Sequence, residues 1–419
     1  MSGRHFLSCL CVTALTGVVG ACSFGDPADE DVGQTAPVTI EPFPPEVGVK
    51  PLDHQAEPLP ADPPIRFKKL FALGRGWQRG AAFSFVAFSP NGRILAASRA
   101  EGRQPNEVAL WDLQSRKLLH RLAHTNDPDE RVGAIAFLSG GDRVVTACWK
   151  RNKVFLWDVQ TGNLLETLDA GGKANKSVTG LAAFPDGKRV ICCAGSGLIV
   201  WDTDRKTQET LSLKEHVPVG RFRTPTYPGY CSSAAFTADG SHFAGNVNDV
   251  LYAPTLLVFD GKTCRVTGVI PIRPGNYFFA YAPDGSSFAA DYYDPDLPHS
   301  FDPTVGKTVV GIWDVRSGKK ILAGRLFNWG TCDLTYTRDG KYLVAAGVHR
   351  DRLEGGGTPV IGVWDLSTGK VVNEIRAASS PFGLLPASLA ISPDNKLLAV
   401  PGPEIEIYAI EYAQQPKRR

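Results

Sequence analysis

Side chains that could hold a metal ion gather in one stretch of the chain. It contains four carboxylates and one imidazole, those of Asp291, Asp294, Asp296, Asp302 and His299. Carboxylate oxygens are the ligands that Ca²⁺ takes in proteins. The spacing matches no calcium-binding loop, however, and three interspersed prolines are typical of an ordinary polar loop. We keep Asp291, Asp294 and Asp296 as metal candidates only, and the sequence predicts no cofactor.

Signatures of catalysis are missing from the sequence. It has no Gly-x-Ser-x-Gly, His-Glu-x-x-His, Cys-x-x-Cys or phosphate-binding loop. Gly74, Gly76 and Gly80 are spaced almost like a dinucleotide-binding fingerprint, but the third glycine comes one place late and no helical pattern follows. We read this segment as a loop between strands and predict that the protein is not an enzyme.

Cys22 has the most specific predicted chemistry in the chain. It follows a basic start and an apolar run over residues 6–19, too short for a membrane span of about 20 residues. The tetrapeptide Val19-Gly20-Ala21-Cys22 resembles the bacterial lipobox. That resemblance implies cleavage before Cys22, lipidation of its thiol and anchoring in the bacterial cell envelope. By analogy, Ser23 favours the outer membrane, with a periplasm-facing position open; an ordinary secretory signal is the alternative.

The segment that follows Cys22 is acidic and rich in proline. Residues 23–64 hold nine acids, one base and ten prolines, whereas residues 65–419 carry 43 bases and 34 acids. Such a composition cannot build a core, so it predicts a tether. The predicted organisation is a signal peptide (1–21), a lipidated tether (22–64), a repeat domain (65–413) and a basic tail (414–419).

Seven copies of one unit fill the predicted repeat domain. Each ends on an apolar run and an aromatic residue, which are Trp111, Trp157, Trp201, Phe259, Trp313, Trp364 and Tyr408. The residues one and three places before each aromatic are aliphatic, which is the period of a strand with one buried face. Upstream of each aromatic lies a turn of the Pro-Asp-Gly type, such as Pro185-Asp186-Gly187. Four strands per unit, repeated seven times, are typical of propeller blades.

With five Trp-Asp pairs among these copies, the chain from about 66 to 412 resembles the WD-repeat β-propeller family. The resemblance implies an all-β, seven-bladed propeller of four-stranded antiparallel blades, of the diverged bacterial type. The family's Gly-His dipeptide is missing; only His124 and His216 stand near its place. The family's Asp–His–Ser–Trp hydrogen-bond network is therefore expected to be absent or replaced.

The ring is expected to close by pairing its two ends. Nothing strand-like follows Tyr412, whereas the run Ile65–Phe71 precedes the first repeat and has no inner partners of its own. We predict that this run completes the last blade and removes its exposed edge.

One face of the ring is predicted to carry the binding site. In several repeats, more residues separate the Pro-Asp-Gly turn from the repeat aromatic than in the shortest repeats. These additional residues predict insertions at 246–254, 291–308 and 348–359, and a long connection joins two repeats at 214–230; all are expected on one face. Aromatic and basic side chains fall there, and we take as partner-binding candidates Trp77, Trp149, Arg151, Tyr227, Tyr230, Tyr292, Tyr293, Trp329, Arg350 and Arg352. The structural alternative is that the aromatic side chains fill gaps between blades.

These observations favour a monomeric, membrane-anchored, non-catalytic propeller that binds a protein or peptide outside the cytoplasm. The alternative is a lactonase-like hydrolase or a carbohydrate-binding protein that uses the same face. Export argues against nucleic acid as a partner. The six cysteines after Cys22 lack a disulfide framework, so we expect thiols and leave one bridge open.

Overall fold

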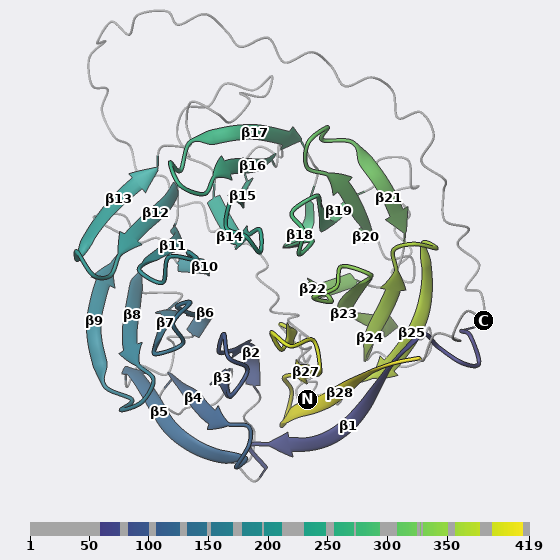
Figure 1. The fold of residues 1–419 in the computed structure, drawn as a ribbon, viewed down its shortest axis with the longest axis horizontal. Coiled ribbons are helices and arrows are strands. Elements are labelled where there is room, and N and C mark those ends of the chain that lie inside the picture. The colour runs from purple at the N-terminus through teal and green to yellow at the C-terminus, as the bar shows by residue number, and fades with distance from the viewer. Residues whose placement is uncertain are drawn as a thin grey trace, which may run out of the picture.

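The computed structural model describes residues 59–75, 83–99, 106–125, 132–148, 152–170, 178–194, 197–211, 230–248, 255–271, 274–293, 308–324, 327, 330–350, 357–377 and 388–413. All regular structure in these ranges is β-strand, arranged as seven four-stranded antiparallel sheets in a ring (Figure 1). No helix in the described ranges is long and apolar enough to cross a membrane. The fold is the seven-bladed propeller that the repeats predict.

The strands are given blade by blade, from the inner strand outward. Blades one to three are β2 (Phe83–Phe88), β3 (Ile94–Arg99), β4 (Asn106–Asp112), β5 (Lys117–Thr125); β6 (Val132–Phe137), β7 (Arg143–Cys148), β8 (Lys153–Asp158), β9 (Leu164–Asp169); β10 (Val178–Ala183), β11 (Arg189–Ala194), β12 (Gly197–Asp202), β13 (Thr207–Leu211). Blades four and five are β14 (Tyr230–Phe236), β15 (His242–Asn248), β16 (Thr255–Asp260), β17 (Val266–Pro271); β18 (Pro274–Tyr281), β19 (Ser287–Tyr293), β20 (Thr308–Asp314), β21 (Lys320–Gly324). Blades six and seven are β22 (Gly330–Tyr336), β23 (Tyr342–Arg350), β24 (Gly357–Asp365), β25 (Lys370–Arg376); β26 (Ala390–Ile391), β27 (Leu397–Val400), β28 (Ile405–Tyr412), β1 (Ile65–Leu73).

Blade seven closes the ring by joining the two ends of the described chain. β1 pairs antiparallel with β28, from Ile65 opposite Tyr412 to Leu73 opposite Ile405 (Figure 1). Lys69 on β1 forms an ion pair with Glu406 on β28, and Glu406 also accepts a 2.6 Å hydrogen bond from the Tyr408 hydroxyl. The predicted closure by the first strand is confirmed.

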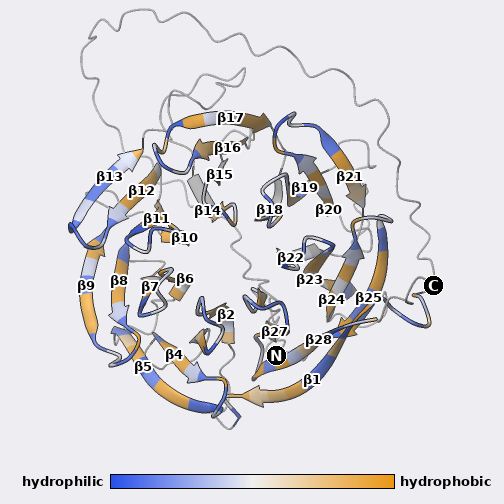
Figure 2. Cartoon of the chain, in the orientation of Figure 1, coloured by the Kyte–Doolittle hydropathy of each residue, from blue (hydrophilic) through white to orange (hydrophobic). Residues whose placement is uncertain are grey.

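Apolar side chains from facing blades make the core. The aliphatic residues before each repeat aromatic are buried, and the cluster around Trp201, for example, draws on blades two and three. The same aliphatic bands run along the strands in Figure 2. Because each blade buries its faces mainly against its two neighbours, the ring forms one continuous structure although the chain is long.

The short turns between the first two strands of each blade also contact one another around the ring. Each holds a residue with positive φ, Gly240 at 69° among them. A Cβ atom on Gly240 would lie 2.2 Å from Pro185 of the preceding blade. Asn395 (φ 61°) takes the glycine position in blade seven and accepts a hydrogen bond from Arg338 N of blade six. The turns therefore help to fix the order and spacing of the blades.

The predicted insertions are shorter in the structure than in the sequence reading. β15 continues to Asn248, β19 to Tyr293 and β23 to Arg350. The last two residues of β19 pair with Val309 and Thr308 of β20. The expected boundaries were wrong because a hairpin partner extends a strand through residues that, taken alone, have the composition of a loop.

Candidate interaction site

The topology separates two faces of the propeller. In each blade, the connections from first to second strand and from third to fourth strand lie on one face, which we call the turn face. The connections from second to third strand and from one blade to the next lie on the opposite face, which we call the extended face. The residues predicted to bind a partner were assigned to the extended face.

Among the described residues, blade six has the longest hairpin of second and third strands at the extended face. Its second and third strands pair as far as Arg350 opposite Gly357. In blade two, the corresponding pairing stops at Ala147 opposite Val154. β23 has nine residues where β7 has six, so the additional residues of blade six lengthen its hairpin beyond the common repeat.

Four predicted binding residues have described backbone at this face. Tyr230 begins β14, Tyr292 and Tyr293 end β19, and Arg350 ends β23. Inner strands begin and second strands end at the extended face, so the topology brings these four positions to one side of blades four, five and six. The other candidates lie outside the described residues: Trp77, Trp149, Arg151, Tyr227, Trp329 and Arg352.

Phe327, in the connection between blades five and six, is a feature that the sequence reading missed. Its ring is buried against blade six, where a Cβ atom on Gly347 would lie 2.1 Å from it and one on Gly362 would lie 3.4 Å from it. The sequence does show that glycines interrupt two strands of an otherwise apolar blade, and the pairing of β23 with β24 brings these glycines to the same ring. This notch fixes the connection that leads into β22.

A histidine–carboxylate pair lies beside this notch. His349 Nε2 is 3.0 Å from Glu374 Oε2, and the His349 ring stands edge-on to Phe327 at 5.8 Å between ring centroids. Both side chains of the pair are partly exposed. The pair joins the second and fourth strands of blade six across β24, so it stiffens this long hairpin.

The metal reading of residue 291 is not supported by its position. Asp291 lies on β19 opposite Val310 and is fully buried, whereas the sequence placed it in an exposed loop. Among the described residues, no group of three His, Cys, Asp or Glu side chains could hold a metal ion. Asp294 and Asp296 lie outside the described residues.

One carboxyl group of the inner strands has an unusual environment. Asp333 on β22 accepts a hydrogen bond from Leu389 N of blade seven. Removal from water raises the pKa of Asp333 to about 7, against the opposing effect of the N–H groups of Leu389 and Leu334. A carboxyl with this pKa could act as a general base. Here, however, it is engaged in holding a neighbouring blade.

Blade seven repeats this contact on its other side. Ser388 lies three residues before Ile391, as Asp333 lies three before Tyr336. Its Oγ accepts a 2.9 Å hydrogen bond from Val86 N of blade one. The equivalent positions in the first three blades are Phe85, Ala134 and Gly180, none of which has a side-chain acceptor. Side-chain acceptors therefore link the closing blade to both of its neighbours.

The turn face is held by carboxylates that close turns. In the turn that follows β4, Asp112 Oδ1 accepts from Ser115 N at 2.7 Å, and Asp158, Asp260 and Asp314 accept in the same way in their blades. The N–H of Ser115 and the guanidinium of Arg93 lower the pKa of Asp112 to about 2. The aspartate that follows the repeat aromatic in blades one to six thus stabilises a turn, a role that the sequence reading left unassigned.

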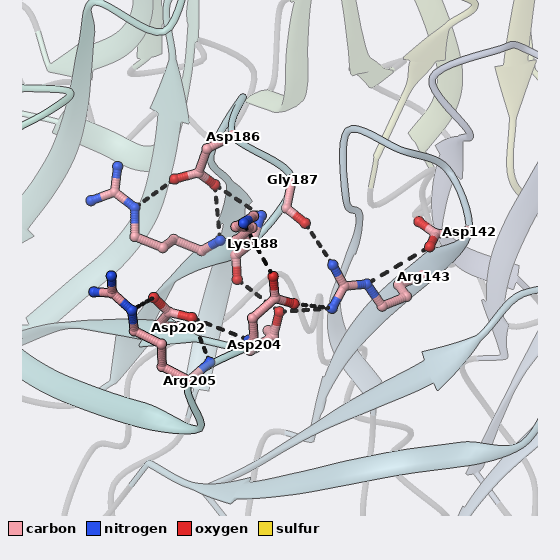
Figure 3. Close-up of polar contacts among 10 residues, drawn as sticks. Asp142, Arg143, Asp186, Gly187, Lys188, Asp202, Asp204 and Arg205 are labelled. Atoms are coloured by element: carbon pink, nitrogen blue, oxygen red, sulfur yellow. Dashed lines mark hydrogen bonds and ion pairs between the residues drawn. The ribbon is translucent and has the colours of Figure 1, made fainter.

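Arg143 joins blades two and three on the same face (Figure 3). It donates to Asp204 Oδ1 at 2.8 Å, Gly187 O at 2.9 Å and Thr203 Oγ1 at 3.1 Å. Asp204 also lies 3.6 Å from Lys188. These charges are satisfied within the protein, so the arrangement is a structural contact between blades.

Blade two retains a polar contact around its tryptophan. Trp157 Nε1 donates to Thr146 Oγ1 at 2.9 Å, and His124 Nε2 lies 2.6 Å from the same oxygen. In the other blades, the residues at the position equivalent to Thr146 have no side-chain oxygen; they are Ala97, Cys192, Gly245, Ala290, Ala345 and Val400. Trp364 Nε1 accordingly has no hydrogen-bond partner among the described residues. Thr146 thus links the tryptophan of blade two to His124 on β5 of blade one.

The described cysteines are mostly core residues. Cys148, Cys192, Cys193 and Cys332 are buried, and burial raises the pKa of the Cys192 thiol to about 12. Cys192 and Cys332 are free thiols, as is the partly buried Cys264. Residues 9, 11 and 22 lie outside the described ranges, as does the side chain of residue 231. The described thiols pack as small hydrophobic groups.

Comparison with known proteins adds no further information about the site. No protein-family model matches the chain, and no curated protein is similar to it. The fold and the two faces described above are therefore the basis for a functional conclusion: a seven-bladed β-propeller with a general capacity for binding or scaffolding.

Proposed function

We propose that this protein is a membrane-anchored, non-catalytic propeller that holds a protein or peptide partner on its extended face, outside the cytoplasm. The observation that carries the proposal is the convergence of Tyr230, Tyr292, Tyr293 and Arg350 at that face of three adjacent blades. Tyrosine and arginine are over-represented among residues that dominate binding energy. The lengthened hairpin of blade six adds surface at the same place.

Assignment to the WD-repeat type is part of the proposal. Its support is the burial of the repeat tryptophans between blades, the turn-closing role of the following aspartates and the contact of His124 in blade one with Thr146 and Trp157 in blade two. WD-repeat propellers are generally platforms for partners, which agrees with the absence of catalytic motifs in the sequence.

Anchoring is proposed from the lipobox-like sequence that ends at Cys22. Two acyl chains hold a protein on a bilayer, whereas one does not hold it stably. The test is fractionation of bacterial envelopes that contain the full chain. Cys22→Ala is expected to move the protein from the membrane to the soluble fraction, and Cys11→Ala, within the signal, serves as the control. Unchanged membrane association of Cys22→Ala would refute lipidation.

Partner binding is tested by capture with the full chain. We expect one discrete partner to be retained by the unaltered protein and lost from the Tyr292→Ser, Arg350→Glu double variant. Asn163→Ser, Lys341→Glu is the control, because both residues are exposed on the turn face. Equal capture by all three proteins would reject the extended face as the binding surface.

A further inference from the structure

Exposed basic side chains surround the turn face. They lie in the turns between the third and fourth strands of the blades and are Arg116, Lys117, Arg205, Lys206, Lys262, Arg265, Arg316 and Lys319. We call these turns, with the first three residues of each following outer strand, the turn rim. Blades one, three, four and five each contribute two of these exposed bases, and the rim also contains the half-buried Lys320 of blade five and the exposed Lys370 of blade six.

Most of these bases are not engaged by the protein's own carboxylates. Arg205 lies 3.9 Å from Asp202, and Arg116 lies over the Phe71 ring at 4.3 Å. The other six take part in none of the ion pairs formed among the described residues. The turn carboxylates direct an oxygen at backbone N–H groups within the turns, and Asp204 is paired with Arg143 and Lys188. Glu209, the third residue of β13, is an exposed acid in the same turn rim, so the bases outnumber the exposed acids there and leave the rim with a positive excess.

Large exposed apolar side chains lie on the same rim. Leu119 is 41% exposed, Leu164 and Leu165 are each 48% exposed, and Ile321 is 57% exposed. All four fall within the first three residues of an outer strand. The two leucines stand in blade two, whose turn, Gln160-Thr161-Gly162-Asn163, has no base. Blades one and five thus carry both bases and an exposed aliphatic side chain on the turn rim, blade two carries only the leucines, and blades three and four carry only bases.

We propose that the turn rim contacts the surface of a bilayer that contains anionic lipids. Each Lys or Arg near such a surface adds attraction, and aliphatic side chains can enter the interface between headgroups and acyl chains. An acidic polysaccharide would use the bases but gives no reason for exposed leucine and isoleucine beside them. The proposal rests on the proposed function for the presence of a membrane, and it would point the extended face away from the bilayer towards a partner.

The test measures binding of the full chain to vesicles of phosphatidylcholine with and without phosphatidylglycerol. Every protein carries Cys22→Ala, so that no lipid anchor contributes and all share the same N-terminal segment. We expect binding that requires phosphatidylglycerol and weakens with added salt. Lys206→Glu, Lys262→Glu is expected to lower the affinity by at least about twentyfold, and Leu164→Ser, Leu165→Ser by roughly tenfold.

The matched control is Lys68→Glu, Arg376→Glu, which changes the net charge equally. Both control residues are exposed, one midway along β1 and one at the end of β25 on the extended face. Unfolding of each variant in urea establishes that it is folded. Equal losses in control and rim variants, or no preference for anionic vesicles, would overturn the proposal. Retained binding in the leucine variant together with base-dependent binding to dextran sulfate would indicate a polysaccharide surface instead. Failure here leaves the Cys22 fractionation and the partner capture unaffected.

Discussion

The side chain of Asp333 in blade six is hydrogen-bonded to the backbone N–H of Leu389 in blade seven. Ser388, the residue before Leu389, makes the equivalent contact with Val86 N of blade one. The blade that closes the ring is thus linked to its neighbours at its inner edge, in addition to the pairing of β1 with β28 at its outer edge. Because the inner-edge contact involves the carboxyl group of Asp333, whose pKa is raised, the stability of the closed ring should depend on pH.

Asp333 should make the ring less stable as the pH rises. Its folded pKa of about 7 lies above the ordinary value of 3.8, so between these values the folded chain binds a proton that the unfolded chain releases. The free energy of unfolding is expected to fall by on the order of 2 kcal/mol from about pH 5 to about pH 8. Asp333→Asn should flatten this slope in urea unfolding. Asp239→Asn is the control, because Asp239 has a pKa of about 2 and its carboxyl group does not titrate in this range. An unchanged slope in Asp333→Asn would contradict the assignment.

The turn carboxylates should give the opposite dependence in acid. Backbone and hydroxyl hydrogen bonds of Ser241 and Thr237 lower the pKa of Asp239 to about 2, below the ordinary 3.8. Stability from this group is complete above about pH 4 and is lost as the pH falls through 2. Asp239→Asn keeps a hydrogen-bond acceptor but does not titrate. Its melting temperature should therefore fall less between about pH 4 and pH 2.5 than that of the unaltered protein. A larger loss in the variant would show that charge on this turn is unimportant.

Ring closure should be sensitive to the ion pair across β1 and β28. Lys69→Met leaves the nearly buried Glu406 with only the Tyr408 hydroxyl, and we expect a loss of about 1–3 kcal/mol in unfolding free energy. Lys68→Met alters the exposed neighbour and should change stability by less than about 0.5 kcal/mol. Combining Lys69→Met with Glu406→Gln should recover part of the loss. Equal effects at residues 68 and 69 would contradict the role of the pair.

Two buried tyrosines should respond differently to loss of the hydroxyl. Tyr281 Oη is buried and has no hydrogen-bond partner among the described residues, whereas Tyr408 donates to Glu406. Tyr281→Phe is expected to leave stability unchanged or raise it by about 1 kcal/mol, since an unpaired buried hydroxyl is costly. Tyr408→Phe should cost about 1–3 kcal/mol. Thermal unfolding of both variants measures the difference, and a loss at residue 281 as large as that at residue 408 would be evidence for an additional partner.

The repeats made the fold predictable, because each blade repeats the same pattern of buried aliphatic residues before an aromatic and the same turn residues. Closure by Ile65–Leu73 followed from counting strands. The contacts that join blades were not predictable, since the positions of Asp333 and Ser388 hold Phe85, Ala134 and Gly180 in the first three blades and follow no repeat pattern. Strand ends were also misjudged, because the length of β19 is set by its partner β20 and Asp291 is therefore buried rather than exposed.

The sequence predicted the face on which four of the candidate residues lie, but not the contacts that support that face. The tyrosines and the arginine on blades four to six stood out by residue type and by unusual spacing. The site for Phe327 depends on Gly347 and Gly362, which lie diagonally across β23 and β24, with Gly347 opposite Val360 and Gly362 opposite Ala345. The proximity of these two glycines follows from the register of β23 against β24, which the composition of the strands does not give.

The extended face as the binding surface is tested most directly by site-specific photo-crosslinking of the full chain in bacterial cells. A photoreactive residue is placed at Arg350, at Tyr292 or, on the turn face, at Asn163. The account predicts the same discrete protein adduct from positions 350 and 292 and none of that mass from position 163. An adduct of that mass from position 163 alone, or no protein adduct from either extended-face position, would contradict it.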